Sequence, residues 1–225
     1  MTRRLVSALY REWYPFFDLM GDIFTDKAVV MYPDELHPGD VLIVWGGSDI
    51  HPSLYGHGRS RKSGAGPSPS ERDVMEWNLM QRAKELKIPI IGVCRGAQML
   101  CALEGGHLIQ HVTDHAGGGH HIQTKEGRTL VVNSLHHQMM APGNTKHELL
   151  AWSEPRSNAY HVFMEDAEAV LPAGWLAKEP EFVYFPEVQG FAIQWHPEME
   201  MYPEDATDYI VDTIREKLHA NTILS

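Results

Sequence analysis

Short apolar runs alternate along the chain with longer segments in which apolar residues recur at helical spacing. The β-branched runs at 41–44 and 88–93 are typical of buried parallel strands. The predicted strands are 4–9, 28–32, 41–45, 88–93 and 191–195, and the predicted helices are 13–24, 70–86, 95–103 and 204–219. Residues 107–152 are typical of short strands and turns. This alternation predicts an α/β fold, a three-layer sandwich with a mostly parallel central sheet flanked by helices.

Composition narrows the classes of function. The length of 225 residues suits one domain covering 1–225, long enough to bury a full core. Lysine and arginine number 19 against 30 aspartates and glutamates, and no basic stripe is present, so nucleic acid is not an expected partner. The sequence has no apolar run long enough to span a bilayer and no secretory signal pattern. Together with only two cysteines, this favours a cytoplasmic protein with no membrane partner.

The junction within IPIIGVCRGAQMLCAL, at 88–103, is the strongest candidate for chemistry. It places Cys94 between a β-branched run and a run of good helix formers. Gly92 and Gly96 flank it, as in the strand-to-helix turn that presents a hydrolase nucleophile, where a Cβ would crowd the backbone. A helix N-terminus also favours a thiolate. Cys94 is therefore the candidate nucleophile, and the alternative is a buried structural cysteine.

The segment FAIQWHPE, at 191–198, contains the groups that a cysteine nucleophile requires. Pro197 fixes φ and donates no backbone hydrogen bond, so the strand is expected to end there with His196 and Glu198 at its end. Hydrolysis needs a base that takes the thiol proton and a third group that orients the imidazole. His196 and Glu198 are the candidates for these roles. Because the chain has 14 histidines, a His-x-Glu spacing alone is weak evidence. Its occurrence together with the Cys94 junction makes the evidence much stronger.

Gly46 and Gly47 follow the apolar run at 41–45. Adjacent glycines after a strand let backbone N–H groups approach a ligand closely. We expect the N–H of Gly47 to join that of Arg95 as an oxyanion hole, with Arg95 acting through its backbone. The alternative is an ordinary Gly-Gly turn.

Six segments, taken together, resemble the class I glutamine amidotransferase-like superfamily, most closely its gamma-glutamyl hydrolase branch. They are GGSDIHPSLYG at 46–56, RDVME at 72–76, GVCRGAQML at 92–100, GGHLIQ at 105–110, VNSLHHQ at 132–138 and QWHPE at 194–198. The resemblance covers about residues 41–219 and implies a flavodoxin-like fold. It also implies that Cys94, His196 and Glu198 form a triad that cleaves a gamma-glutamyl amide through a thioester.

The resemblance implies substrate contacts as well. By family position, Gln98 contacts the glutamyl part of the substrate, and Ser134, His136 and His137 belong to the loop that holds its alpha-amino acid end. The chain departs from the branch in two places. The half before Gly46 is shortened by one peripheral unit, and His57 stands where the branch often has an acidic residue. Both places are where substrate selectivity or oligomer contacts would be built.

Three functions remain open. The first is a self-contained hydrolase of gamma-glutamyl amides, the second a glutaminase subunit that supplies ammonia to a synthetase partner, and the third a non-catalytic binding relative. The presence of all three triad residues disfavours the third, and the DIHPSLYG and VNSLHHQ segments favour the first. A small-molecule gamma-glutamyl substrate is the expected partner, with a synthetase or a second copy in a homodimer as further candidates.

Histidines are dense between residues 107 and 137. They are His107, His111, His115, His120, His121, His136 and His137. Such density can indicate metal, but no cysteine pair is nearby and the glycines at 117–119 would make a loose ligand scaffold. No metal and no other cofactor is expected. Several of these imidazoles are expected to line the pocket, where they could bind a substrate carboxylate or tune Cys94.

Overall fold

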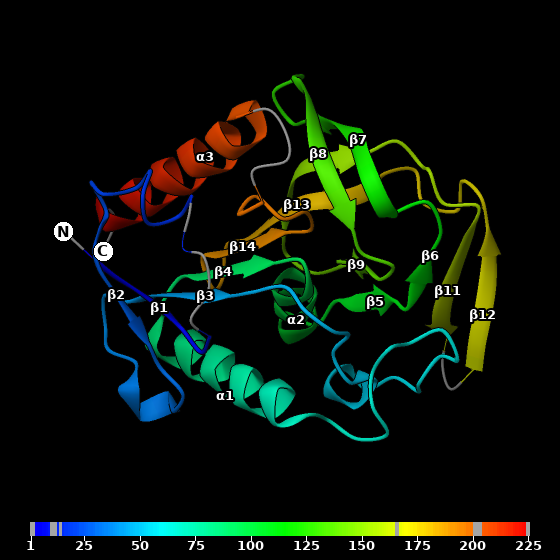
Figure 1. Ribbon diagram of the computed structural model, residues 1–225, viewed down its shortest axis with the longest axis horizontal. Helices are drawn as coiled ribbons and strands as arrows, with labels where there is room; N and C mark the ends of the chain where they lie inside the picture. Colours follow the sequence, from blue (N-terminus) through cyan, green and yellow to red (C-terminus); the bar gives the residue numbers. More distant parts are fainter. Residues whose placement is uncertain (1–2, 10–12, 14, 165–166, 200–203, 224–225) are drawn as a thin grey trace.

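In the computed structural model, which describes residues 3–9, 13, 15–164, 167–199 and 204–223, a nine-stranded sheet runs through the molecule (Figure 1). Its strands are, in spatial order, β2 (Phe24–Val29), β1 (Arg3–Ser7), β3 (Val41–Val44), β4 (Ile90–Val93), β14 (Gly190–Ile193), β13 (Glu179–Phe185), β10 (Glu148–Ser153), β7 (Ala116–Thr124) and β8 (Thr129–Leu135). The first five strands of this order, from β2 to β14, pair in parallel. The remaining pairings, from β14 through β13, β10 and β7 to β8, are antiparallel.

Smaller sheets lie at the end of the molecule away from β1 and β2 (Figure 1). One pairs β5 (His107–Ile109) with β9 (Met139–Ala141), and the other consists of β12 (Ala167–Pro172), β11 (Ala159–Met164) and β6 (His111–Val112). Two short 3-10 helices, η1 (Pro33–Glu35) and η2 (Pro52–Tyr55), complete the connections.

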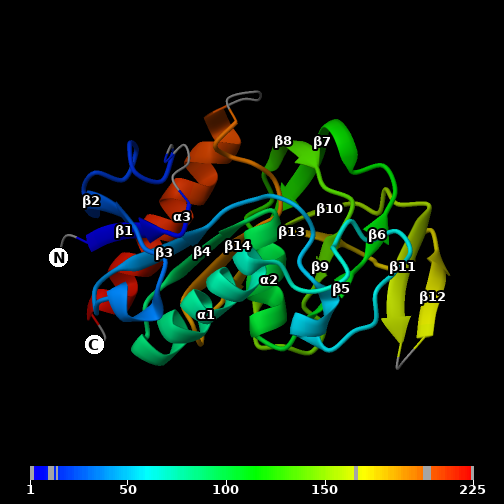
Figure 2. The same cartoon turned by 60° about the horizontal axis from the view of Figure 1, so that its bottom comes forward.

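Helices cover both faces of the parallel strands, which makes three layers. Figures 1 and 2 show α1 (Glu71–Leu86) and α2 (Arg95–Leu103) on one face and α3 (Glu204–Ile223) on the other. Ile43 of β3 belongs to the core that contains Ile214 of α3, whereas Leu42 belongs to the core that contains Leu79 of α1. Every residue of β3 and β4 is buried, as their near-continuous apolar sequence predicts.

The predicted α/β class is confirmed, although the antiparallel pairings make the sheet more mixed than expected. The three helices predicted after residue 70 are present, and the start at Ser70 is a capping box: its hydroxyl accepts from the N–H of Asp73, whose carboxylate accepts from the N–H of Ser70. None of the helices in the described ranges combines the length and the apolar content needed to cross a membrane.

The predicted helix at 13–24 is wrong for the part that the structure describes. Residues 15–18 and 21–23 form turns, and β2 begins at Phe24, so the strand predicted at 28–32 lies earlier. Helix-like hydrogen bonds are confined to short pieces, such as Phe17 N–H to Trp13 O at 3.0 Å. Pro15 and Gly21 leave too short a stretch between them for a stable helix. Residues 10–12 and 14 lie outside the described residues.

Candidate active site

Cys94 occupies a strained turn between β4 and α2. Its φ of 50° and ψ of −105° lie outside the regions that L-residues prefer. A Cβ on Gly92 would lie 2.5 Å from the carbonyl oxygen of Gly96, and a Cβ on Gly96 would lie 2.0 Å from the carbonyl oxygen of Val44. Both glycines are therefore required by close backbone contacts, as the sequence predicted. The N–H of Cys94 donates to the carbonyl of Ile193 at 2.7 Å, which ties the turn to β14.

His196 lies just beyond the end of β14 and points toward two side chains. Its Nδ1 is 2.8 Å from Oε1 of Glu198, and the ring also makes a side-chain hydrogen bond with Cys94. Burial lowers the pKa of His196, but the hydrogen bonds with Cys94 and Glu198 raise it by more than burial lowers it. The resulting pKa is about 10. The structure thus brings Cys94, His196 and Glu198 into one chain of contacts and favours a positively charged imidazole at neutral pH.

Asn133 of β8 holds the backbone of His196 in place. Its Nδ2 donates to the carbonyl of His196 at 2.7 Å, and its Oδ1 accepts from the N–H of His196 at 2.8 Å. This two-point contact spans two distant parts of the chain and fixes the imidazole's point of attachment. Sequence reasoning missed this role, because it assigned a function only to the neighbouring residues 134–137 and nothing in the residue type of Asn133 indicated a backbone partner.

The Gly46-Gly47 turn lies directly against the imidazole. A Cβ on Gly46 would lie 2.4 Å from Cε1 of His196, and a Cβ on Gly47 would lie 2.2 Å from Nη1 of Arg72. Arg72 donates to the carbonyls of Trp45 and Gly46, each at 3.0 Å. The turn is therefore clamped by an arginine of α1, whose role the sequence did not reveal.

The side chain of Arg95 extends to α1. It is buried and forms ion pairs with Asp73 and Glu76 of α1. The backbone of Arg95 begins α2, so its N–H has no partner within the helix. The side chain of Arg95 is therefore held by α1, and the expected role of its backbone N–H in an oxyanion hole stays a prediction.

The predicted substrate residues do not all face one point. Gln98 donates to the carbonyl of Gln138 at 3.0 Å, and Nδ1 of His136 lies 2.8 Å from the same oxygen. The hydroxyl of Ser134 donates to the carbonyl of His115 at 2.7 Å. His137 is half-exposed, and its Nε2 lies 3.0 Å from the carboxylate of Asp49, which raises the pKa of the imidazole.

The sequence profile of the Peptidase C26 family matches residues 26–198, most of the chain. The chain belongs to the peptidase C26 family. The resemblance found in the sequence is thereby confirmed. The chain is similar to the gamma-glutamyl-gamma-aminobutyrate hydrolase of Escherichia coli O157:H7, with 31% identity over 119 residues. These residues cover 40% of this chain and 45% of that protein.

Other relatives of the peptidase C26 chain are glutamine amidotransferase-like. One is the protein YvdE of Lactococcus lactis subsp. lactis, 27% identical over 161 residues, 71% of this chain and 66% of that protein. The matches span only about half the length of two others, from Schizosaccharomyces pombe and Mycobacterium tuberculosis (48% and 52%). A solved glutamine amidotransferase from Methylobacillus flagellatus shares the fold, with a TM-score of 0.53 and 12% identity over 88% of this chain and 71% of that chain.

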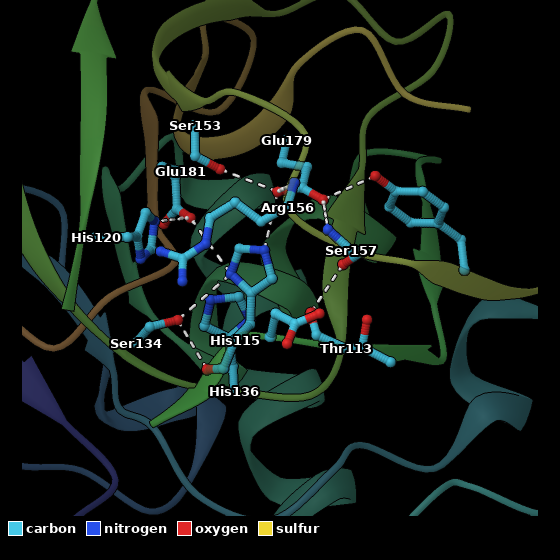
Figure 3. A network of polar contacts seen from close by, with 12 residues as sticks. Thr113, His115, His120, Ser134, His136, Ser153, Arg156, Ser157, Glu179 and Glu181 are labelled. Atoms are coloured by element: carbon cyan, nitrogen blue, oxygen red, sulfur yellow. Dashed lines mark hydrogen bonds and ion pairs between the residues drawn. The ribbon is translucent and has the colours of Figure 1, made fainter. Parts of the chain in front are cut away.

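A second polar cluster, the histidine–glutamate cluster, is buried in the antiparallel part of the peptidase C26 chain (Figure 3). It consists of His115, His120, His136, Glu179 and Glu181. Figure 3 shows His115 between Glu179 and Ser134, and His120 beside Glu181. Burial raises the pKa of Glu181 to about 7 and lowers that of His136 to about 4. Sequence reasoning missed the two glutamates, because nothing in the local pattern of β13 connects them with the histidines.

Proposed function

We propose that this chain hydrolyses gamma-glutamyl amide bonds, in glutamine or in gamma-glutamyl amines, through a thioester on Cys94. The observation that carries the proposal is the contact chain from Cys94, in its strained turn, through His196 to Glu198. A nucleophile, a base within hydrogen-bond reach of it and a carboxylate that orients the base are the three parts of cysteine-dependent amide hydrolysis.

In the acylation half, the Cys94 thiolate attacks the gamma-carbonyl carbon and forms a tetrahedral intermediate. The C–N bond then breaks, and protonated His196 gives its proton to the departing amine. Glu198 accepts a hydrogen bond at Nδ1 of His196, so the other ring nitrogen is the one that transfers the proton. The product of this half is a gamma-glutamyl thioester and a free amine.

In the deacylation half, His196 takes a proton from water, and the resulting hydroxide attacks the thioester carbon. The C–S bond breaks, glutamate leaves and the Cys94 sulfur is released. The same imidazole thus acts first as acid and then as base, which requires that its position stays fixed through both steps. The two hydrogen bonds from Asn133 to the backbone of His196 support that requirement.

For the oxyanion we propose the backbone N–H groups of Gly47 and Arg95. The first residues of α2 pack directly on the end of β3, as the contact between Gly96 and the carbonyl of Val44 shows. The turn that follows β3 therefore lies beside the N-terminus of α2, where N–H groups and the helix dipole favour negative charge.

For the substrate, we propose that Gln98 contacts the glutamyl part and that the 134–137 loop holds its alpha-amino acid end. His137 and Asp49 form a hydrogen-bonded pair at the more exposed part of this region and offer a donor and an acceptor, which suits a substrate with both an amino and a carboxylate group. Ser134, near the end of β8, and His136, just beyond it, lie on the buried side of this segment, where they contact His115 and Gln138.

The second candidate function, a glutaminase subunit that supplies ammonia to a synthetase, is favoured by one surface feature. An open groove of about 490 Å³ is lined by Met31, Tyr32 and Val74, among others. These three side chains are 50%, 65% and 47% exposed, which is typical of an interaction surface. The carbamoyl phosphate synthase small chain of Syntrophotalea carbinolica is also a relative, 24% identical over 135 residues.

Glutamate release from glutamine and from a panel of gamma-glutamyl amides tests the proposal. The intact chain is expected to turn over at least one compound, and Cys94→Ala is expected to lower that rate by at least about 1,000-fold while the melting temperature is kept. Turnover that survives in Cys94→Ala would refute the mechanism. Silence on every compound, with Cys94 still alkylated by iodoacetamide, would favour the glutaminase subunit.

A further inference from the structure

Three side chains of the histidine–glutamate cluster bring ligating atoms together. His115 precedes β7, His136 follows β8 and Glu181 lies within β13, and one atom from each lies within 4.8 Å of the other two. All three side chains are buried. We propose that His115, His136 and Glu181 form a binding site for a divalent transition-metal ion of the zinc class.

Both imidazoles are oriented as metal ligands usually are. A metal-bound histidine donates its other ring N–H to a carboxylate or a carbonyl, which fixes the tautomer. Nε2 of His115 lies 2.9 Å from Oε2 of Glu179, and Nδ1 of His136 lies 2.8 Å from the carbonyl oxygen of Gln138. These acceptors take one N–H from each ring, so Nδ1 of His115 and Nε2 of His136 are the atoms that face the cluster.

The carboxylate of Glu181 is oriented in a similar way. Nε2 of His120 lies 2.8 Å from Oε1 of Glu181, which leaves Oε2 as the free oxygen. Among the described residues, neither Oε2 of Glu181 nor Nε2 of His136 has a hydrogen-bond partner, and both atoms are buried. The positive charge of Arg156 favours an ionised Glu181 but does not supply that missing partner. Buried polar atoms without partners are uncommon and call for an occupant.

A cation suits these atoms better than a proton does. A proton can join two acceptors and leaves the third without a partner, whereas one divalent ion can be bound by all three. Two imidazole nitrogens and one carboxylate form a ligand set that zinc uses, with one position left for water or another oxygen. The hydroxyl oxygen of Ser134 lies 3.3 Å from Nδ1 of His115 and is a candidate for that position. Magnesium and calcium prefer all-oxygen sites and do not fit two imidazoles.

This proposal departs from the sequence-based expectation of no metal site. That expectation rested on the spacing of the histidines, the lack of a nearby cysteine pair and the glycines at 117–119, whereas the third ligand comes from β13, far along the chain. None of the three ligands belongs to the Cys94, His196 and Glu198 contact chain. His136 also lies in the segment that the proposed function assigns to substrate binding, so metal binding is measured directly and not through activity.

The test is the binding of Co²⁺ and Zn²⁺ to the whole chain after treatment with a chelator. The intact protein is expected to bind one equivalent, and Co²⁺ is expected to give visible absorption bands of a four-coordinate site. Glu181→Gln and His136→Ala are each expected to weaken binding by at least about 100-fold. Circular dichroism and thermal melting show whether each variant folds, and the two different substitutions guard against a folding failure in one.

A matched control is His111→Ala. His111 lies against His137 at the surface, with 3.3 Å between their Nδ1 atoms, and this pair is the obvious place for adventitious metal. Metal binding is expected to survive in His111→Ala. Binding that is lost in His111→Ala and kept in Glu181→Gln would overturn the proposal. A folded protein that takes up no Co²⁺ would also overturn it and would mean that protons hold the cluster together.

Discussion

The parallel and antiparallel parts of the sheet fix their polar groups by different means. In the parallel part, main-chain contacts set the geometry: Cys94 has a positive φ, and Gly92 and Gly96 allow backbone to touch backbone. In the antiparallel part, side chains from distant strands hold one another, as His115 does with Glu179. The turn that carries Cys94 is built by residues close together in sequence, although it packs on distant strands, whereas the second kind of site depends entirely on how far-apart strands align.

The two regions also set histidine charge in opposite directions. His196 has the Glu198 carboxylate and Cys94 as partners, and its pKa is raised to about 10 despite burial. His136 donates to a neutral carbonyl, and burial lowers its pKa to about 4. Burial alone therefore does not decide the protonation state of an imidazole. The charge of its partner does, which suits the first histidine to acid–base chemistry and the second to ligation by a lone pair.

The main-chain part of this comparison predicts the largest effect on stability. Gly96→Ala would place a Cβ 2.0 Å from the carbonyl oxygen of Val44, where backbone and not a flexible side chain must move. The free energy of unfolding is expected to fall by about 3 kcal/mol or more in urea denaturation. Gly21→Ala is the control, since its Cβ would meet nothing within 4 Å and should cost no stability. Equal stability of the two variants would contradict the close packing at the turn.

Sequence patterns predicted the parallel part well for the same reason. The positions of Cys94, of the flanking glycines and of the strand that leads to His196 are all local features, and the helix starting at Ser70 carries its own capping signal. The turns at 15–18 and 21–23 lie in a segment whose buried apolar residues, Trp13, Phe16, Met20 and Ile23, are spaced as on a helix face, although no helix forms there. The partners in β8 and β13 could not be predicted, because strand pairing, and not local spacing, brings them to the histidines.

Asn133 of the antiparallel part holds the backbone of His196, which follows a strand of the parallel part. Its substitution is expected to have an intermediate effect on stability and activity. In Asn133→Asp the Oδ1 acceptor for the His196 N–H is kept, but the donor to the His196 carbonyl is replaced by an oxygen. Loss of that hydrogen bond is expected to cost about 1–3 kcal/mol of stability. A displaced imidazole is expected to lower kcat/KM by about 10- to 100-fold for the substrate that the intact chain turns over.

The exposed Asn144 gives a matched control for that substitution. Asn144→Asp makes the same chemical change where nothing is held in place, and neither stability nor kcat/KM is expected to move. A fall in stability without any fall in kcat/KM for Asn133→Asp would mean that His196 keeps its position by other contacts. The backbone clamp would then be structural only.

The smallest expected effect is that of Glu198 on the pH dependence of stability. It is measured in the Cys94→Ala background, where the thiol no longer contributes to the pKa of His196. Burial lowers the pKa of His196 from its ordinary value of 6.5, and the hydrogen bonds with Cys94 and Glu198 both raise it, so Glu198→Gln in the background without the thiol is expected to lower the pKa further. A raised folded-state pKa adds stability that is complete below 6.5 and is lost as pH rises through the folded value. Cys94→Ala is therefore expected to exceed Cys94→Ala/Glu198→Gln in stability by about 1 kcal/mol at pH 6, with the difference shrinking toward pH 10.

Urea denaturation from about pH 6 to pH 10 measures this difference in the free energy of unfolding, and NMR titration of His196 measures the change in its pKa. A difference that does not change with pH would show that Glu198 orients the imidazole without stabilising its charge.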